Sequence, residues 1–155
     1  MTTPTTTLSP PTCIPFQRRY PAHPASVSRA RHSITDAIDH GLLGPATARD
    51  PDLTEALRLL ASELVTNAIT HSASEPDDLI EVTLWIADRH LWLAVTDHGA
   101  RLPIRRMASP SSTHGRGLEL VEALASIWGT LPRREGTGKV VFAGLPVSTL
   151  GAVAH

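Results

Sequence analysis

The stretch Glu-Leu-Val-Thr-Asn-Ala-Ile-Thr-His, residues 63–71, decides the fold of this chain. It lies near the end of a predicted long amphipathic helix, in which apolar residues recur at helical spacing, namely Leu53, Leu57, Leu60, Leu64 and Ala68. Asp50 is a favourable N-cap residue, and Pro51 suits the first helical position. Glu63 and Asn67 are four residues apart, so their side chains are neighbours at the edge of the apolar stripe.

This pair of polar residues allows two interpretations. A carboxylate can act as a general base, and an amide oxygen can bind a hard cation such as Mg²⁺, so Glu63 and Asn67 could line a pocket. They could equally be two ordinary polar residues that flank a core stripe. The helix alone leaves both interpretations open.

The composition indicates a soluble globular protein. The chain has 155 residues, enough for one domain with a core, and 41% of them are hydrophobic. A net charge of −1 gives no whole-chain electrostatic reason to expect nucleic acid or an anionic membrane as a partner. Cys13 is the only cysteine, which excludes an internal disulfide and a cysteine-based zinc site. No apolar run approaches about 18 residues, and the N-terminus lacks the apolar segment of a signal peptide, so we expect a cytoplasmic protein.

The ends of the chain differ from its middle. Residues 1–15 are rich in Thr and Pro and are predicted to be a disordered tail. Residues 16–147 are predicted to form one domain, and residues 148–155 a frayed tail. Within the domain, residues 16–20 could form an edge strand, and a helix is predicted from Ala25 to His40, where Gly41 ends it.

Two strands are predicted to follow the long helix. Residues 79–87 alternate between apolar and polar side chains, as a half-buried strand does, and residues 91–96 form the second arm of an antiparallel hairpin. That second strand leads directly into Asp97-His98-Gly99. A carboxylate beside a glycine at a strand end is frequent in ligand sites, although Asp-x-Gly is also common turn chemistry.

The last third of the sequence contains a loop, a helix and a hairpin. Residues 100–114 show no periodicity, which indicates either a functional lid or an insertion. Gly-Arg-Gly-Leu at 115–118 opens a predicted helix that runs to Trp128, and backbone N–H groups at such a start can face an anion. Residues 130–134 and 140–145 are predicted as two further strands joined by a hairpin loop.

Taken in this order, the four features resemble the GHKL ATPase superfamily, which has the Bergerat ATP-binding fold. The features are Glu-x-x-x-Asn on a helix, strand-Asp-x-Gly, a long loop, and Gly-x-Gly-Leu opening a helix. The resemblance covers roughly residues 34–147. Three segments, Glu-Leu-Val-Thr-Asn-Ala, Gly-Arg-Gly-Leu-Glu-Leu-Val and Val-Val-Phe-Ala-Gly-Leu-Pro, look most like the small stand-alone regulators of the anti-sigma kinase type.

The resemblance implies a role for each matched position. Glu63 would polarise the attacking hydroxyl or water, and Asn67 would bind Mg²⁺. Asp97 would accept a hydrogen bond from the adenine amine, and Gly99 would let the base lie close. Thr137 would match the threonine that reaches the water network between aspartate and adenine.

The start of the predicted helix at residues 115–118 would hold the phosphates. Gly115 and Gly117 would bring backbone N–H groups to them, Arg116 could add a cation, and Leu118 completes the motif. The sequence departs from the family where Ala100 stands in place of a frequent glycine, and the loop after it is short for a lid.

These implications give the expected fold and function. The fold should be a two-layer α/β sandwich, with about three helices on one face of a mixed, mostly antiparallel sheet. The function should be that of an ATP- and Mg²⁺-dependent serine/threonine kinase acting on an anti-anti-sigma-like protein, with a sigma factor as a second possible partner and a homodimer as a possible state. The alternatives are a catalytically weak ATP-dependent binding module and a detached histidine-kinase-like ATPase domain. No direct nucleic-acid or membrane partner is expected.

Overall fold

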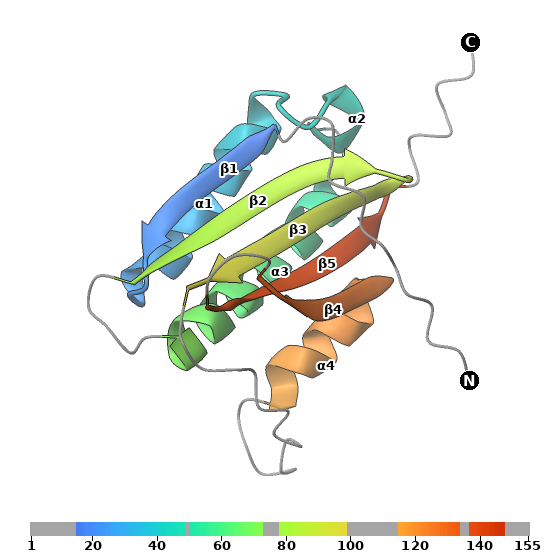
Figure 1. The fold of residues 1–155 in the computed structure, drawn as a ribbon. Helices are drawn as coiled ribbons and strands as arrows, with labels where there is room; N and C mark the ends of the chain where they lie inside the picture. The colour runs from blue at the N-terminus through green and yellow to red at the C-terminus, as the bar shows by residue number, and fades with distance from the viewer. Residues whose placement is uncertain (1–14, 49, 73–77, 99–114, 134–136, 148–155) are drawn as a thin grey trace, which may run out of the picture.

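A five-stranded sheet forms one layer of the protein, and helices cover one of its faces (Figure 1). The computed structural model describes residues 15–48, 50–72, 78–98, 115–133 and 137–147. The strands are β1 Phe16–Pro21, β2 Leu79–Ala87, β3 His90–Asp97, β4 Ile127–Pro132 and β5 Lys139–Pro146. Their order is β1-β2-β3-β5-β4, and all four described pairings are antiparallel. The predicted two-layer α/β sandwich is therefore confirmed, and the sheet, expected to be mixed but mostly antiparallel, is antiparallel in every described pairing.

The helical layer consists of α1 Ala25–Asp39, α2 Pro45–Ala48, α3 Pro51–Ser72 and α4 Gly115–Leu124. The predicted start of α3 is confirmed, because the Leu53 N–H donates to Asp50 Oδ1 at 3.0 Å. Gly41 follows α1 with a positive φ of 74°, as a glycine stop requires. None of the described helices is long and apolar enough to cross a membrane. The predicted tails, apart from Pro15, and the predicted lid at 100–114 lie outside the described residues.

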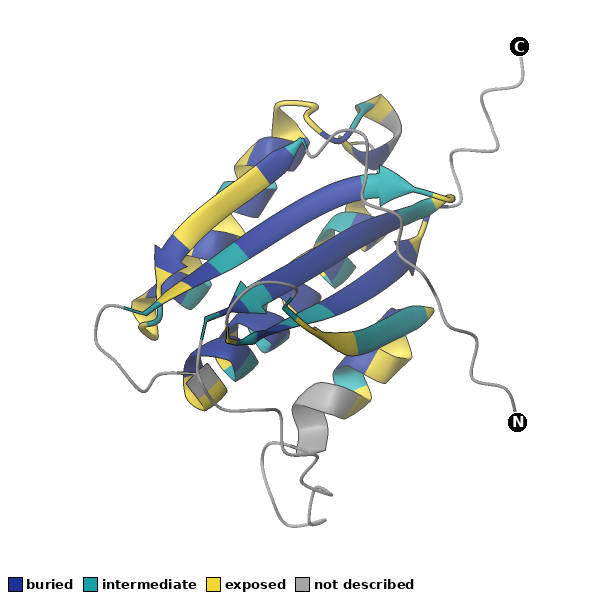
Figure 2. Cartoon of the chain, viewed as in Figure 1, coloured by how far each residue is buried: buried dark blue, intermediate teal, exposed yellow. Residues whose placement is uncertain are grey.

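The core lies between α3 and the sheet. Leu57, Leu60 and Leu64 of α3 are fully buried and belong to one cluster with side chains from α1 and the strands, including Ile34, Ile38, Val82, Leu84 and Leu93 (Figure 2). Burial of each such side chain contributes about 1.5–3 kcal/mol of transfer free energy. The apolar stripe read from the sequence therefore fixes the rotation of α3, and with it the direction in which Glu63 and Asn67 point.

The opposite face of the sheet carries a second cluster, which makes the prediction of a half-buried β2 incomplete. Trp85, Trp92, Ala94 and Phe142 form this cluster, and Trp85 and Trp92 stack with ring centroids 6.2 Å apart. Trp85 and Trp92 are also opposite each other in register. The middle of β2, from Val82 to Trp85, is consequently buried on both faces, which alternation in the sequence alone could not indicate.

The predicted boundary between the last helix and the next strand is wrong. The helix was expected to reach Trp128, but α4 ends at Leu124 and β4 begins at Ile127. The Ala125 N–H still donates to the Val121 carbonyl, whereas the Ser126 N–H donates to the Gly144 carbonyl of β5 at 3.0 Å. Pairing with a neighbouring strand overrides the helical spacing, because isoleucine and tryptophan favour strands.

The edge strand β1 is held to β2 by an ion pair. Arg19 and Glu81 are opposite each other in register, and Arg19 Nε lies 2.9 Å from Glu81 Oε2. Burial alone would raise the pKa of Glu81, but hydrogen bonds from Arg19 and Gln17 outweigh it and lower the pKa below its ordinary value of 4.5. The pair therefore stabilises the sheet edge when Glu81 is ionised.

This shift predicts part of the acid sensitivity of the fold. A carboxyl whose pKa is lower in the folded than in the unfolded chain contributes stability above its ordinary pKa and loses it as the pH falls through the folded pKa. Glu81→Gln should therefore reduce the loss of unfolding free energy between about pH 5 and pH 3, by less than about 1 kcal/mol because the pair is partly exposed. Urea unfolding across this range measures it. Glu55→Gln, which breaks an exposed pair with Arg58, is the control. An equal effect of both variants would contradict the assignment.

Candidate functional site

Four elements that carry the predicted site residues meet at one end of the protein. The C-terminal half of α3, the end of β3, the start of β5 and the start of α4 lie at the lower end of the view in Figure 1. β3 and β5 are direct neighbours in the sheet, and α3 contacts β3, β5 and α4. The fold therefore brings segments from four separate parts of the sequence to one place.

Glu63 and Asn67 lie at the border of the buried side of α3. Both side chains are half-buried, whereas Leu64 and Ala68 beside them are buried and Thr66 is exposed. A carboxylate and an amide on one helix face, each still open to solvent, can reach a ligand placed against α3. The structure thus places the pair as the sequence predicts, while their roles stay a prediction.

Asp97 is the last residue of β3, and it is buried with 2% of its surface exposed. Lys139, the first residue of β5, is opposite it in register and only 9% exposed. Lys139 Nζ lies 3.9 Å from Asp97 Oδ2. A charged pair at this depth is costly to desolvate, and each partner compensates the charge of the other. The end of β3 therefore presents a carboxylate next to a buried cation.

Lys139 was missed in the sequence-based prediction. It is the only lysine in the chain and it follows a glycine at the start of a strand, which was the available signal. Which residue lies opposite Asp97 depends on the register between β3 and β5, and a sequence does not give this register for strands that are distant along the chain.

Thr137 also lies beside the end of β3, but it is exposed where Lys139 is buried. Its Oγ1 donates to the His98 carbonyl at 3.3 Å. Gly138 follows with a φ of 115°, and a Cβ there would clash with the Asp97 carbonyl oxygen. Glycine therefore lets the backbone before β5 lie directly against the end of β3. The predicted link between Thr137 and a bound base stays a prediction.

The remaining predicted residues are placed only in part. Helix α4 begins at Gly115, so Gly-Arg-Gly-Leu at 115–118 does open a helix, as predicted. The side chains of Arg116 and Leu118, and the whole of Gly99, lie outside what the structure describes. The N-terminal end of α4 can offer backbone N–H groups and a partial positive charge to an anion.

The site therefore combines four chemical functions at one end of the sheet. Asp97 is a buried hydrogen-bond acceptor, Glu63 a candidate base, Asn67 a candidate cation ligand, and the start of α4 a candidate anion site. This set fits an adenine nucleotide with its phosphates and a divalent cation.

The Lys139–Asp97 pair gives a prediction for stability. Lys139→Met should lower the free energy of unfolding by roughly 1–3 kcal/mol, because it removes the cation that lies beside the buried Asp97 carboxylate. Adding Asp97→Asn to this variant should recover part of the loss. Urea denaturation measures both effects. Arg18→Met, at an exposed cation on β1, is the control and should stay within about 0.5 kcal/mol of the wild type. If Lys139→Met costs no more than this control, the pair does not stabilise the strand end.

Comparison with known proteins points in the same direction as the geometry. A family model described as a histidine kinase-like ATPase domain matches residues 20–143, a range that contains every residue predicted for the site. A search of curated proteins finds no match.

Two solved structures from Erythrobacter litoralis EL346 are similar to this chain. The histidine kinase domain of its blue-light activated histidine kinase gives a TM-score of 0.47 and 22% identity, over 85% of this chain and 64% of that chain. The blue-light activated histidine kinase itself gives a TM-score of 0.49 and 24% identity, over 86% of this chain and 44% of that one. This chain spans less than two thirds of the length of either structure.

Proposed function

The chain belongs to the family of histidine kinase-like ATPase domains, and from this premise we propose that it binds MgATP and phosphorylates a serine or threonine of a partner protein. The observation that carries the proposal is the placement of the buried Asp97 at the same end of the fold as Glu63, Asn67 and the start of α4. The choice of serine or threonine as acceptor is supported by the resemblance of the three quoted segments to stand-alone anti-sigma kinases.

Recognition of the base would fall to Asp97. An ionised carboxylate only accepts hydrogen bonds, so it complements the exocyclic amine of adenine. Because Asp97 is buried, the contact would form in a region of low dielectric constant, where a correct partner gains more and a wrong one costs more. Lys139 would compensate the negative charge of this carboxylate.

The phosphates and the cation would be held by the two helices. The N-terminal N–H groups of α4 suit phosphate oxygens, and the Asn67 amide oxygen suits Mg²⁺. ATP, when bound, supplies the γ-phosphoryl group. Glu63 would accept the proton of the attacking hydroxyl, and positioning and charge compensation account for most of the catalysis in such reactions.

A second candidate is a detached histidine-kinase-like ATPase domain that serves a separate phosphoacceptor protein. The family description supports this second candidate as directly as it supports the first, because the description names histidine kinases. The two candidates share the ATP site and differ in the acceptor residue. For the serine/threonine kinase, the resemblance supports an anti-anti-sigma-like protein or a sigma factor as partner and a homodimer as a possible state.

The stability of the transferred phosphate separates these candidates. The protein is incubated with γ-labelled ATP and a heat-treated extract of its own cells, in which other kinases are inactive, and the labelled proteins are treated with acid. We expect acid-stable label on a specific protein. Label that is lost in acid would indicate histidine phosphorylation instead. No label on any protein, together with MgATP binding, would leave an ATP-dependent binding module and overturn the kinase proposal.

A further inference from the structure

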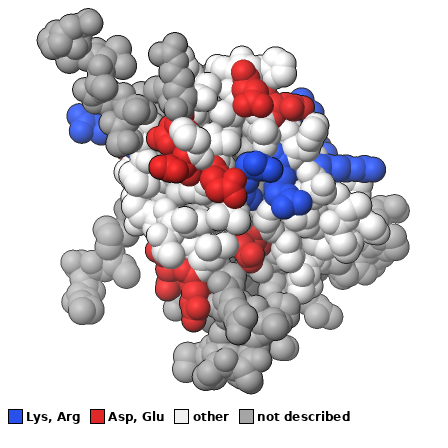
Figure 3. Space-filling view, turned by 180° about the vertical axis from the view of Figure 1, so that it is seen from behind, with Lys and Arg blue, Asp and Glu red and all other residues white. Residues whose placement is uncertain are grey.

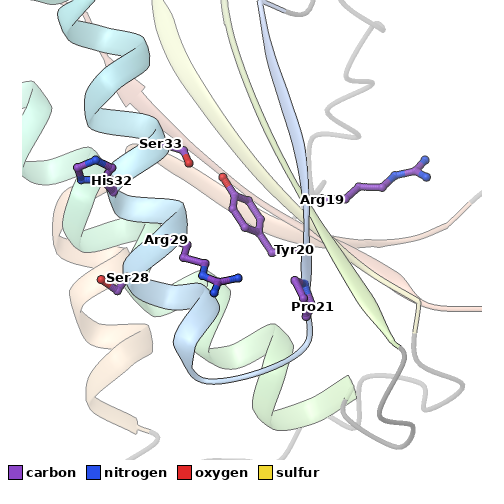
Figure 4. Close-up of a pocket in the computed structure, with 7 residues that line it drawn as sticks. All are labelled: Arg19, Tyr20, Pro21, Ser28, Arg29, His32 and Ser33. Atoms are coloured by element: carbon purple, nitrogen blue, oxygen red, sulfur yellow. The ribbon is translucent and has the colours of Figure 1, made fainter.

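A hollow lies between the edge strand β1 and helix α1, away from the site described above. Tyr20 and Pro21 of the strand and Ser28, Arg29 and Ser33 of the helix line it, as Figure 4 shows. No acidic residue is among its lining residues. The side chains that line this hollow, which include His32, thus offer hydroxyl, guanidinium and imidazole groups and no carboxylate.

The Tyr20 hydroxyl is the feature that needs an explanation. Tyr20 is 7% exposed, and its hydroxyl is buried without a hydrogen-bond partner among the described residues. In Figure 4 the ring extends from β1 towards α1, with the hydroxyl directed towards Ser33. An unpaired buried hydroxyl costs free energy in the unbound protein, and a ligand that accepts its proton would remove that cost.

Arg29 is the cation available to such a ligand. Arg19 is paired with Glu81, and in Figure 4 its side chain points away from the hollow. Arg29 forms no ion pair with any carboxylate that the structure describes, and it projects beside Tyr20 and Pro21. A free guanidinium beside an unpaired hydroxyl suits an oxyanion, because both groups can donate to it.

Arginines also line a second hollow beside the first, where Arg58 is paired with Glu55. An adjoining hollow is lined by Arg31, Thr35 and Arg58 and shares Ser28 and His32 with the first. Figure 3, seen from the helix-covered side, shows arginine or lysine side chains gathered on this face, with acidic residues beside them. A ligand with more than one negative charge could therefore contact both hollows.

The neighbouring sheet edge indicates what kind of ligand reaches the hollow. β1 is the first strand in the sheet order, so its outer edge pairs with no strand that the structure describes. An extended peptide can add to such an edge, and every second side chain would then point towards the helical layer. Charged residues on an edge strand also discourage aggregation, but this role does not account for the buried Tyr20 hydroxyl.

We propose that this hollow binds an acidic side chain of a partner protein whose extended segment pairs with the outer edge of β1. The carboxylate would accept hydrogen bonds from Arg29 and from the Tyr20 hydroxyl, after a small shift of the side chains around the hydroxyl. This docking site does not depend on ATP binding, since it lies on other elements of the fold.

A titration followed by amide signals of the ¹⁵N-labelled full chain tests this proposal. The probe is the acetylated peptide Val-Glu-Val-Glu-Val, and the reference probe is the same peptide with glutamine in place of glutamate. We expect the glutamate peptide to shift signals of β1 and of the first half of α1, and the glutamine peptide to bind about tenfold more weakly. Equal binding of both peptides would overturn the proposal, and so would shifts with inorganic phosphate but with neither peptide.

Three variants locate the contacts. Arg29→Gln should weaken binding of the glutamate peptide about tenfold, whereas Arg89→Gln, at an exposed arginine of the β2–β3 turn away from both β1 and the hollow, should leave binding unchanged. Tyr20→Phe should weaken peptide binding by about threefold or more without lowering the melting temperature of the protein, because it removes a hydroxyl that has no hydrogen-bond partner among the described residues. Peptide affinities that are the same in wild type and in Arg29→Gln or Tyr20→Phe would contradict the assigned contacts.

Discussion

Replacing Glu63 by alanine should lower the rate of phosphoryl transfer by about 10²–10⁴, while the affinity for MgATP stays within a few-fold of the wild type. The reason is that Glu63 lies at the half-buried border of α3 and on a different element from Asp97, so it need not touch the base. Transfer of label from γ-labelled ATP gives the rate, and calorimetric titration gives the affinity.

Asn67→Ala should behave differently although it lies one helical turn away. Loss of a Mg²⁺ ligand should weaken MgATP binding and also reduce turnover. Glu55→Ala serves as the matched control, because Glu55 is an exposed glutamate of the same helix whose ion pair is with the exposed Arg58. Transfer that is unchanged in Glu63→Ala would eliminate Glu63 as the base.

Asp97→Asn should lower the affinity for ATP by about one to two orders of magnitude. An amide in this place can direct an N–H group towards the adenine amine, which leaves two buried donors facing each other. The cost of an unpaired buried polar group, about 1–3 kcal/mol, corresponds to this loss of affinity. Calorimetric titration with MgATP measures it.

Two controls test whether unfolding, or the loss of any carboxylate, explains a lower affinity. Circular dichroism should show that Asp97→Asn remains folded, since the substitution also removes the ion pair with Lys139. Asp88→Asn changes an exposed aspartate in the β2–β3 turn, at the other end of β3, where asparagine tolerates the positive φ of 52°. It should bind ATP like the wild type. Wild-type affinity in Asp97→Asn would remove Asp97 from the site.

The sequence predicted the structure best where local signals, such as a helix cap or an apolar stripe, agree with the burial of the side chains. The Asp50 cap and the apolar stripe predicted α3 correctly, and the direction of the stripe placed Glu63 and Asn67 at its border. Asp97 was predicted at a strand end because it directly follows an alternating apolar segment, and the structure has it as the last residue of β3.

The features that the sequence did not predict correctly depend on contacts between segments that are distant along the chain. Trp128 fitted the spacing of α4, yet β5 pairs with it in the sheet. Lys139 looked like an ordinary loop residue until the β3–β5 register brought it opposite Asp97. The hollow at Tyr20 likewise depends on how α1 packs beside β1, and no short motif encodes such packing.

The location of the ATP site is the central claim, and a map of amide signal changes on adding MgATP tests it most directly. ATP is itself an anion, so the same spectra also show whether it binds the arginine-lined hollow instead. We expect changes grouped at the C-terminal half of α3, at Asp97 and His98, at the start of α4 and at residues 137–139, with α1 unaffected. Changes centred on α1 and β1, or no changes at all, would contradict the account.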